Sequence, residues 1–131
     1  MKRIIILLFV AFVSLSCRKD GGGQIIVSDT DIIVSAAGGE VQIETSGAVI
    51  CSISENGSFI KNLRLFDSEV DIEPVVYEGS WYTFSSIDRG GILTLQVRPN
   101  TDSSPRLLTL SLMDADLNAQ IFIEQAGVNE E

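Results

Sequence analysis

Apolar and polar residues alternate along most of this chain with a period of two. The alternation is clearest in the run Glu40-Val41-Gln42-Ile43-Glu44-Thr45. Because successive side chains of a strand point to opposite faces, this run predicts a half-buried strand with one wet face. Gly38 and Gly39 come just before it, and glycine adopts the positive φ angles of tight turns without strain. We therefore predict a hairpin whose two strands lie on either side of these glycines.

Segments of the same kind recur along the chain, separated by short turn-forming stretches. The predicted strands cover residues 24–28, 31–36, 40–46, 48–54, 70–77, 81–86, 92–98, 107–113 and 117–125. Residues 59–66 have a mixed period, which leaves a short helical turn open. Pro74 interrupts one predicted strand and indicates a sheet edge, because proline cannot donate to a ladder. Short strands without a long helix predict an all-β sandwich of about eight strands.

The first residues have the pattern of a bacterial lipoprotein signal. Lys2 and Arg3 precede an apolar run at residues 4–13, which is too short for a membrane span of about 20 residues. Cys17 and a polar, glycine-containing stretch follow. We predict a signal peptide (residues 1–16), a lipidated Cys17 with a flexible tether (17–24), a folded domain (25–127) and a frayed tail (128–131). The alternative is an ordinary cleaved signal that leaves Cys17 unmodified.

The chain is acidic, with nine Lys and Arg against eighteen Asp and Glu and a formal net charge of −9 at pH 7. Loss of Lys2 and Arg3 with the signal would bring the charge to about −11. Phosphate backbones and anionic lipid surfaces repel such a protein. We therefore expect no nucleic-acid partner, and membrane attachment only through the lipid on Cys17.

Catalytic and metal-binding chemistry has little support in the sequence. There is no histidine, the commonest general base and metal ligand, and no serine in a G-x-S-x-G turn. Asp67, Glu69, Asp71 and Glu73 would line one face of a strand, where they would spread over about 20 Å, too far for one Ca²⁺ shell. We predict a protein that is not an enzyme and has no metal or cofactor, with these carboxylates as a solvated edge.

Cys51 is the second of two cysteines in the chain. If Cys17 carries lipid, no intrachain disulfide can form. Cys51 alternates with Val49 and Ile53 on a predicted strand. We therefore expect a buried and inert thiol.

Four pieces of the chain together resemble a BACON domain, the immunoglobulin-like sandwich common in Bacteroidota surface proteins. They are residues 35–41 (SAAGGEV), Trp81, the segment PNTDSSPRLLTLSL with Asn100 and Arg106, and the run Ile121-Phe122-Ile123-Glu124-Gln125-Ala126. The resemblance covers roughly residues 25–127. It implies an immunoglobulin-like β-sandwich and a non-catalytic role in binding glycan or mucin, which has been proposed for this family. Compared with the family, residues 58–79 look like an insertion.

The expected location follows from two resemblances. Lys19-Asp20 is similar to the short charged patch after the lipidated cysteine of surface-exported Bacteroidota lipoproteins. With the BACON resemblance, this implies an outer-membrane, lipid-anchored protein that is exposed either at the cell surface or, as the alternative, on the periplasmic face. The alternative function is a structural or interaction module that serves an outer-membrane protein partner through a sheet edge or residues 58–79.

Aromatic side chains are candidate carbohydrate ligands, because a flat ring packs on the apolar face of a sugar. Residues 79–84 are the densest aromatic patch, with Trp81 on one face of the predicted strand and Tyr82 on the other. A lone Trp in a sandwich is commonly part of the core. That placement would leave Tyr82, with Tyr77 and Phe59, as an exposed platform. The candidate carbohydrate-binding residues are thus Phe59, Tyr77, Trp81 and Tyr82.

Overall fold

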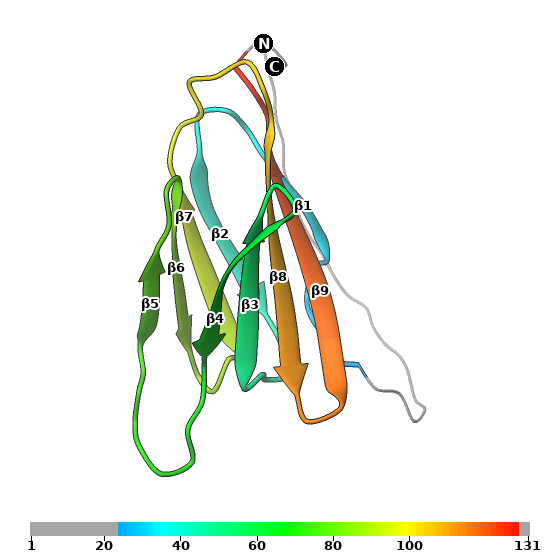
Figure 1. The fold of residues 1–131 in the computed structure, drawn as a ribbon, viewed down its shortest axis with the longest axis vertical. Helices are drawn as coiled ribbons and strands as arrows, with labels where there is room; N and C mark the ends of the chain where they lie inside the picture. The colour runs from blue at the N-terminus through cyan, green and yellow to red at the C-terminus, as the bar shows by residue number, and fades with distance from the viewer. Residues whose placement is uncertain (1–23, 129–131) are drawn as a thin grey trace.

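A computed structural model describes residues 24–128, which form two packed β-sheets (Figure 1). Neither helix nor helical turn occurs among the elements of this range, so the predicted all-β sandwich is confirmed. No helix of the described part is long and apolar enough to cross a membrane. The predicted signal peptide, the lipidated Cys17 and most of the tether lie outside the described residues.

Nine strands make up the sandwich within residues 24–128. The first sheet has the order β1-β9-β8-β3-β4 and the second has the order β2-β7-β6-β5. The strands are β1 (Asp31–Val34), β2 (Gly39–Glu44), β3 (Ile50–Glu55), β4 (Ser58–Arg64), β5 (Val75–Glu78), β6 (Tyr82–Ile87), β7 (Ile92–Val97), β8 (Arg106–Asp114) and β9 (Leu117–Gln125).

The alternating sequence pattern produces the core between the sheets. In β9, Ile121 and Ile123 are fully buried, whereas Phe122 between them is 37% exposed. The same alternation along β3, β6, β7 and β8 brings aliphatic and aromatic side chains of both sheets into one cluster. Each fully buried aliphatic side chain contributes about 1.5–3 kcal/mol relative to exposure. The inward-facing residues therefore supply the main stabilisation of the domain.

The predicted hairpin at Gly38-Gly39 is wrong, although both glycines have positive φ angles of 86° and 153° as expected. β1 and β2 belong to different sheets. β1 is parallel to its partner β9, whereas β2 is antiparallel to its partner β7. The turn therefore crosses from one sheet to the other. A Cβ on Gly38 would lie 2.4 Å from the carbonyl oxygen of Val97, so the close approach also requires glycine.

Three other local predictions can be compared with the structure. Residues 24–28 form no strand: Gln24 and Val27 make only isolated bridges, to Asn118 and Thr45. The residues with a mixed period form β4, not a helical turn. Pro74 directly precedes β5, which is an edge strand as the proline indicated.

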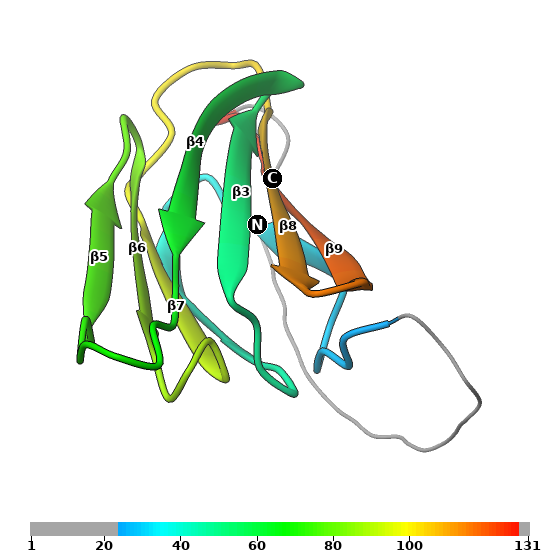
Figure 2. The same cartoon turned by 60° about the horizontal axis from the view of Figure 1, so that its bottom comes forward.

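Residues 58–79 contribute one edge strand to each sheet. β4 and β5 are these strands, at the edges opposite β1 and β2, and the loop of residues 65–74 joins them (Figure 2). β4 pairs with β3 through a bulge next to Ile53 and Ser54. Residues 58–64 and 75–78 are thus part of the sheets. The four carboxylates from Asp67 to Glu73 lie in the connecting loop, so the predicted strand face of acidic residues is wrong.

Candidate functional site

The four aromatic residues predicted as carbohydrate ligands occupy different environments. Trp81 is only 6% exposed, as expected for a core tryptophan, and Tyr82 is fully buried. The expectation that Tyr82 forms an exposed platform is therefore wrong. Tyr77 is half-buried, and its ring centroid lies 6.3 Å from that of Tyr82. Phe59 alone is clearly exposed, at 63%.

Tyr82 is buried because its hydroxyl has a partner. The Tyr82 hydroxyl donates a 2.6 Å hydrogen bond to Oε2 of Glu55, across the gap between the sheets. A buried tyrosine is stable when its O–H finds such an acceptor. Burial raises the pKa of the Tyr82 phenol, and the hydrogen bond to Glu55 raises it further. The ring also covers Gly79, where a Cβ would lie 2.3 Å from the Tyr82 ring.

Trp81 is covered by Arg106, whose guanidinium carbon lies 4.7 Å from the centroid of the indole ring. Nε of Arg106 donates to Oε1 of Gln125 at 2.9 Å. The fully buried Gln125 amide in turn donates to the carbonyl oxygens of Ser35, Ala36 and Arg98. This network joins the turn after β1, the end of β7 and the end of β9.

Asn100 completes the same end of the sandwich. Its side chain is 1% exposed and donates to the carbonyl oxygens of Ser104 and Ala126, at 2.9 and 3.1 Å. Several positions of the BACON resemblance thus meet in one hydrogen-bonded network of buried and half-buried groups, namely Ser35, Ala36, Asn100, Arg106 and Gln125. Their role in this structure is to hold turns and strand ends together.

An uncharged surface, here called the polar face, lies on the outer side of the first sheet. The strand register brings two neighbouring rows together. One row consists of Phe122, Thr109, Ser54 and Phe59, and the other consists of Gln120, Ser111, Ser52 and Asn62. Short hydroxyl and amide side chains therefore lie between two exposed phenyl rings. The rings stand three strand spacings apart, or about 14 Å.

Hydrogen bonds between neighbouring side chains order this polar face. Nε2 of Gln120 donates to Oγ of Ser111 at 3.3 Å, and the Ser52 hydroxyl donates to Oδ1 of Asn62. None of these residues is conspicuous in the sequence. The signal was present, because serine and threonine stand at the outward positions of β3 and β8, between the inward leucines and isoleucines.

A recess of about 430 Å³ adjoins the polar face, between residues 24–30 and β9. Its lining contains amide, hydroxyl and apolar side chains and no charged group; the residues are Gln24, Ile25, Val27, Thr30, Ser111, Leu112, Met113, Asn118, Ala119 and Gln120. Ser111 and Gln120 belong both to this recess and to the polar face. The two features therefore form one continuous uncharged surface.

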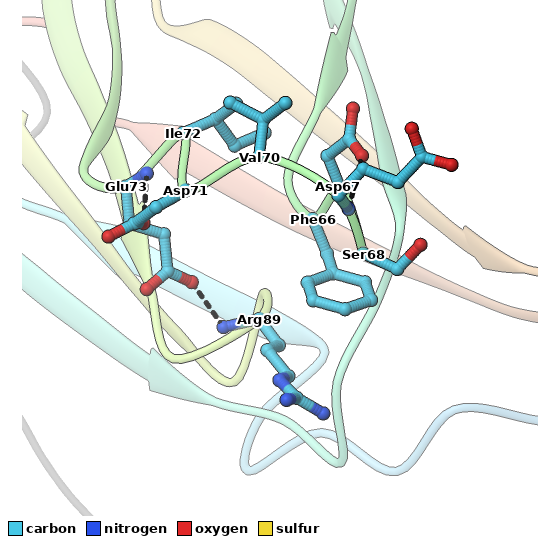
Figure 3. A pocket seen from close by; sticks show the side chains of 9 residues that line it. Phe66, Asp67, Ser68, Val70, Asp71, Ile72, Glu73 and Arg89 are labelled. Atoms are coloured by element: carbon cyan, nitrogen blue, oxygen red, sulfur yellow. Dashed lines mark hydrogen bonds between the residues drawn. The ribbon is translucent and has the colours of Figure 1, made fainter.

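A second recess, of about 330 Å³, lies in the loop between β4 and β5 (Figure 3). The Arg89 guanidinium lies 4.8 Å from the Phe66 ring centroid, and the Arg89 backbone N–H donates to the Glu73 carboxylate. Asp67 and Asp71 accept bonds from the backbone N–H groups of Glu69 and Glu73, each two residues along. These contacts fix the loop to itself and to the β6–β7 turn.

Reactive groups within residues 24–128 are few. No set of three or more Cys, Asp or Glu side chains in this range could hold a metal ion. Cys51 is fully buried, as predicted, and burial raises the pKa of its thiol from 9.0 to about 12. A protonated, inaccessible thiol is a poor nucleophile.

The comparisons with known proteins inform the fold. No protein-family model and no curated protein matches the chain. The NMR structure of a protein from Bacteroides thetaiotaomicron is similar, with a TM-score of 0.62 and 16% identity over 89% of this chain and 98% of that chain. The M4 domain of titin is also similar, with a TM-score of 0.50 and 10% identity over 79% of this chain and 95% of that chain.

These likenesses define the class as an immunoglobulin-like β-sandwich. At 10–16% identity they show the fold alone. Membership of the BACON family stays a prediction.

Proposed function

We propose that this protein is a non-catalytic surface lipoprotein whose sandwich binds neutral glycan through the polar face. The observation that carries the proposal is the uncharged array of hydroxyl and amide groups between Phe59 and Phe122. Hydroxyl and amide groups exchange hydrogen bonds with sugar hydroxyls, while a phenyl ring packs on the apolar face of a pyranose.

The charge of the protein favours a neutral ligand. The chain carries a formal net charge of −9 and repels acidic polymers. The rows between the two rings contain no basic side chain that could pair with a carboxylate or sulfate. Neutral mucin-type glycans fit this surface better than sialylated or sulfated ones.

Of the residues considered from the sequence, the proposal keeps Phe59 as a ligand contact and adds Phe122. Trp81, Tyr77 and Tyr82 become structural residues, since Trp81 and Tyr82 are buried and Tyr77 packs on Tyr82. The resemblance to BACON domains supports the glycan class of ligand.

The test is a binding measurement on neutral mucin O-glycans with the wild-type chain and single variants. Phe59→Ala and Phe122→Ala should each weaken binding by about three- to tenfold, because each removes a ring contact of about 0.5–1.5 kcal/mol. Val76→Ala is the matched control: Val76 is 58% exposed but lies on β5 of the other sheet. Absence of glycan binding, or equal losses in all three variants, would overturn the proposal.

Attachment to the outer membrane through Cys17 is part of the same proposal, supported by the signal-like sequence that precedes it. Cys17→Ser should abolish labelling with a fatty-acid analogue and release the protein from membranes, because the acyl chains are the only anchor proposed. Cys51→Ala, which keeps Cys17, should leave membrane attachment unchanged. Continued membrane attachment of Cys17→Ser would contradict the anchor.

An interaction module is the second candidate function. β5 forms the outer edge of the second sheet and carries the exposed Val76, and a free edge strand can pair with another chain. This function predicts co-purification with an outer-membrane protein and indifference to sugar. Glycan-independent pull-down that Val76→Lys abolishes would favour it over glycan binding.

A further inference from the structure

We infer that the recess between residues 24–30 and β9 binds the acetamido group of an N-acetylated sugar. The inference rests on the glycan-binding function proposed above and names the sugar class. It is based on the backbone of Gln120, one of the residues that line the recess.

The backbone N–H and C=O of Gln120 point to the outer edge of β9. In an antiparallel pair, successive residues direct their N–H and C=O alternately toward the partner strand and away from it. The carbonyl oxygen of Asn118 accepts from Ile25, and the N–H of Phe122 donates to Thr30, so both residues face away from β8. Gln120 lies midway between them and therefore faces the same way.

The chain leaves this edge open opposite Gln120. After Ile25 it turns toward the second sheet, where Val27 forms a bridge with Thr45 and the N–H of Ser28 donates to Glu44. It returns to β9 only at Thr30. None of residues 24–128 provides a hydrogen-bonding partner for the backbone N–H or C=O of Gln120.

One open residue on a strand edge presents one donor and one acceptor side by side. The C=O of an acetamido group can accept from the Gln120 N–H, and a neighbouring hydroxyl of the same sugar can donate to the Gln120 C=O. A longer peptide strand would meet Ile25 and Thr30, which already occupy the edge on either side. The geometry thus favours an acetamido group over an extended peptide.

The walls of the recess suit the remainder of such a sugar. Ile25, Val27 and Ala119 offer apolar contacts to the acetyl methyl group, and Thr30, Ser111 and Asn118 offer hydrogen bonds to ring hydroxyls. The volume of about 430 Å³ lies in the range of small-molecule sites. The lack of charge in the lining matches a neutral N-acetylhexosamine and not a sugar acid.

The decisive measurement is an NMR titration of the ¹⁵N-labelled full chain, solubilised in detergent. N-acetylglucosamine and N-acetylgalactosamine should shift the Gln120 amide signal, and glucose and galactose should bind about three- to tenfold more weakly, because they lack the amide C=O that accepts from Gln120. N-acetylalanine amide is the probe for peptide-like ligands and should bind more weakly than the acetamido sugars, because it has no ring hydroxyls for Thr30, Ser111 and Asn118.

Gln120→Pro provides a second test, since proline removes the edge N–H without removing a bond to β8. It should abolish the preference for acetamido sugars, whereas Gln120→Ala, which keeps the N–H, should retain it. The amide signals of β8 and β9 report whether each variant is folded. If Gln120→Pro does not fold, the titration of the wild-type chain still decides.

The outcomes separate the two proposals. All sugars could bind alike, with the amide signals of Phe59 and Phe122 shifting and that of Gln120 unchanged. This result would overturn the acetamido inference and leave the proposed glycan binding intact. No response to any sugar would overturn both. A Gln120 amide that is protected from exchange without ligand, or one that responds only to N-acetylalanine amide, would assign the recess to the protein's own chain or to peptide and overturn the inference.

Discussion

The Arg106 guanidinium covers the face of Trp81, with its carbon 4.7 Å from the ring centroid, and its Nε donates to the buried Gln125. The contact connects β8 to the residue that precedes β6, and therefore connects the two sheets. A planar guanidinium can stack on an indole ring and hydrogen-bond at its rim simultaneously, which an ammonium group cannot do.

Replacement of Arg106 should therefore cost stability even when the charge is kept. Arg106→Lys loses the stacking and the bonds to Gln125 Oε1 and to the carbonyl oxygen of Pro99, so we expect unfolding free energy to fall by about 1–3 kcal/mol. Urea unfolding followed by the fluorescence of Trp81 measures this change. Arg64→Lys, at an exposed position of β4, is the control and should stay within about 0.5 kcal/mol of wild type. Equal stability of the two variants would contradict the structural role.

Trp81 fluorescence also reports directly on the proposed site. At 6% exposure, the single tryptophan should emit at short wavelength and resist quenching by acrylamide. Saturating glycan should leave its spectrum unchanged, because the polar face lies on the other sheet. A red-shifted, quenchable emission that changes with sugar would place Trp81 in the binding site. It would contradict glycan binding at the polar face.

The sequence was sufficient to predict most strands, because their alternation is strict where one face is buried. It failed at Gly38-Gly39, where the turn was predicted correctly and the partner strands were not. Two strands joined by a tight turn can pair or can diverge into separate sheets. The choice depends on packing of Gly38 against Val97, a contact between residues 59 positions apart.

The candidate site was predicted less well, for a reason visible in Tyr82. Alternation shows that Trp81 and Tyr82 point to opposite faces, but Tyr82 begins β6 and Trp81 precedes it. At that strand end both rings are covered, Trp81 by Arg106 and Tyr82 by the core, with Glu55 as hydrogen-bond partner. The residues that bury these two rings are distant from them in the sequence. The polar face was missed because its residues are ordinary one by one, and only the register of four strands brings them together.

Gly38→Ala should be strongly destabilising because two effects combine. The φ angle of 86° is unfavourable for alanine, and the added Cβ would lie 2.4 Å from the backbone oxygen of Val97. Gly57 has the same φ angle of 86°, but no atom lies within 4 Å of its added Cβ. We expect a loss of about 1–2 kcal/mol for Gly57→Ala from the backbone alone, and a larger loss for Gly38→Ala. Chemical unfolding of both variants separates the clash from the conformational cost, and equal losses would contradict the close approach.

Cys51 should react with a thiol reagent only when the protein unfolds. In a Cys17→Ser background it is the single thiol, it is fully buried, and its pKa is raised from 9.0 to about 12. The labelling rate should follow the unfolding equilibrium in urea.

Because the pKa of Cys51 is raised, the fold stabilises the protonated thiol. This contribution to stability is complete below about pH 9 and is lost as the pH rises toward 12, because the thiol of the unfolded chain ionises first. Wild-type stability should fall more steeply above pH 9 than that of Cys51→Ala, in which Tyr82, whose pKa burial also raises, still titrates in the same direction. Rapid labelling under native conditions, or identical pH profiles for the two proteins, would show that Cys51 is accessible.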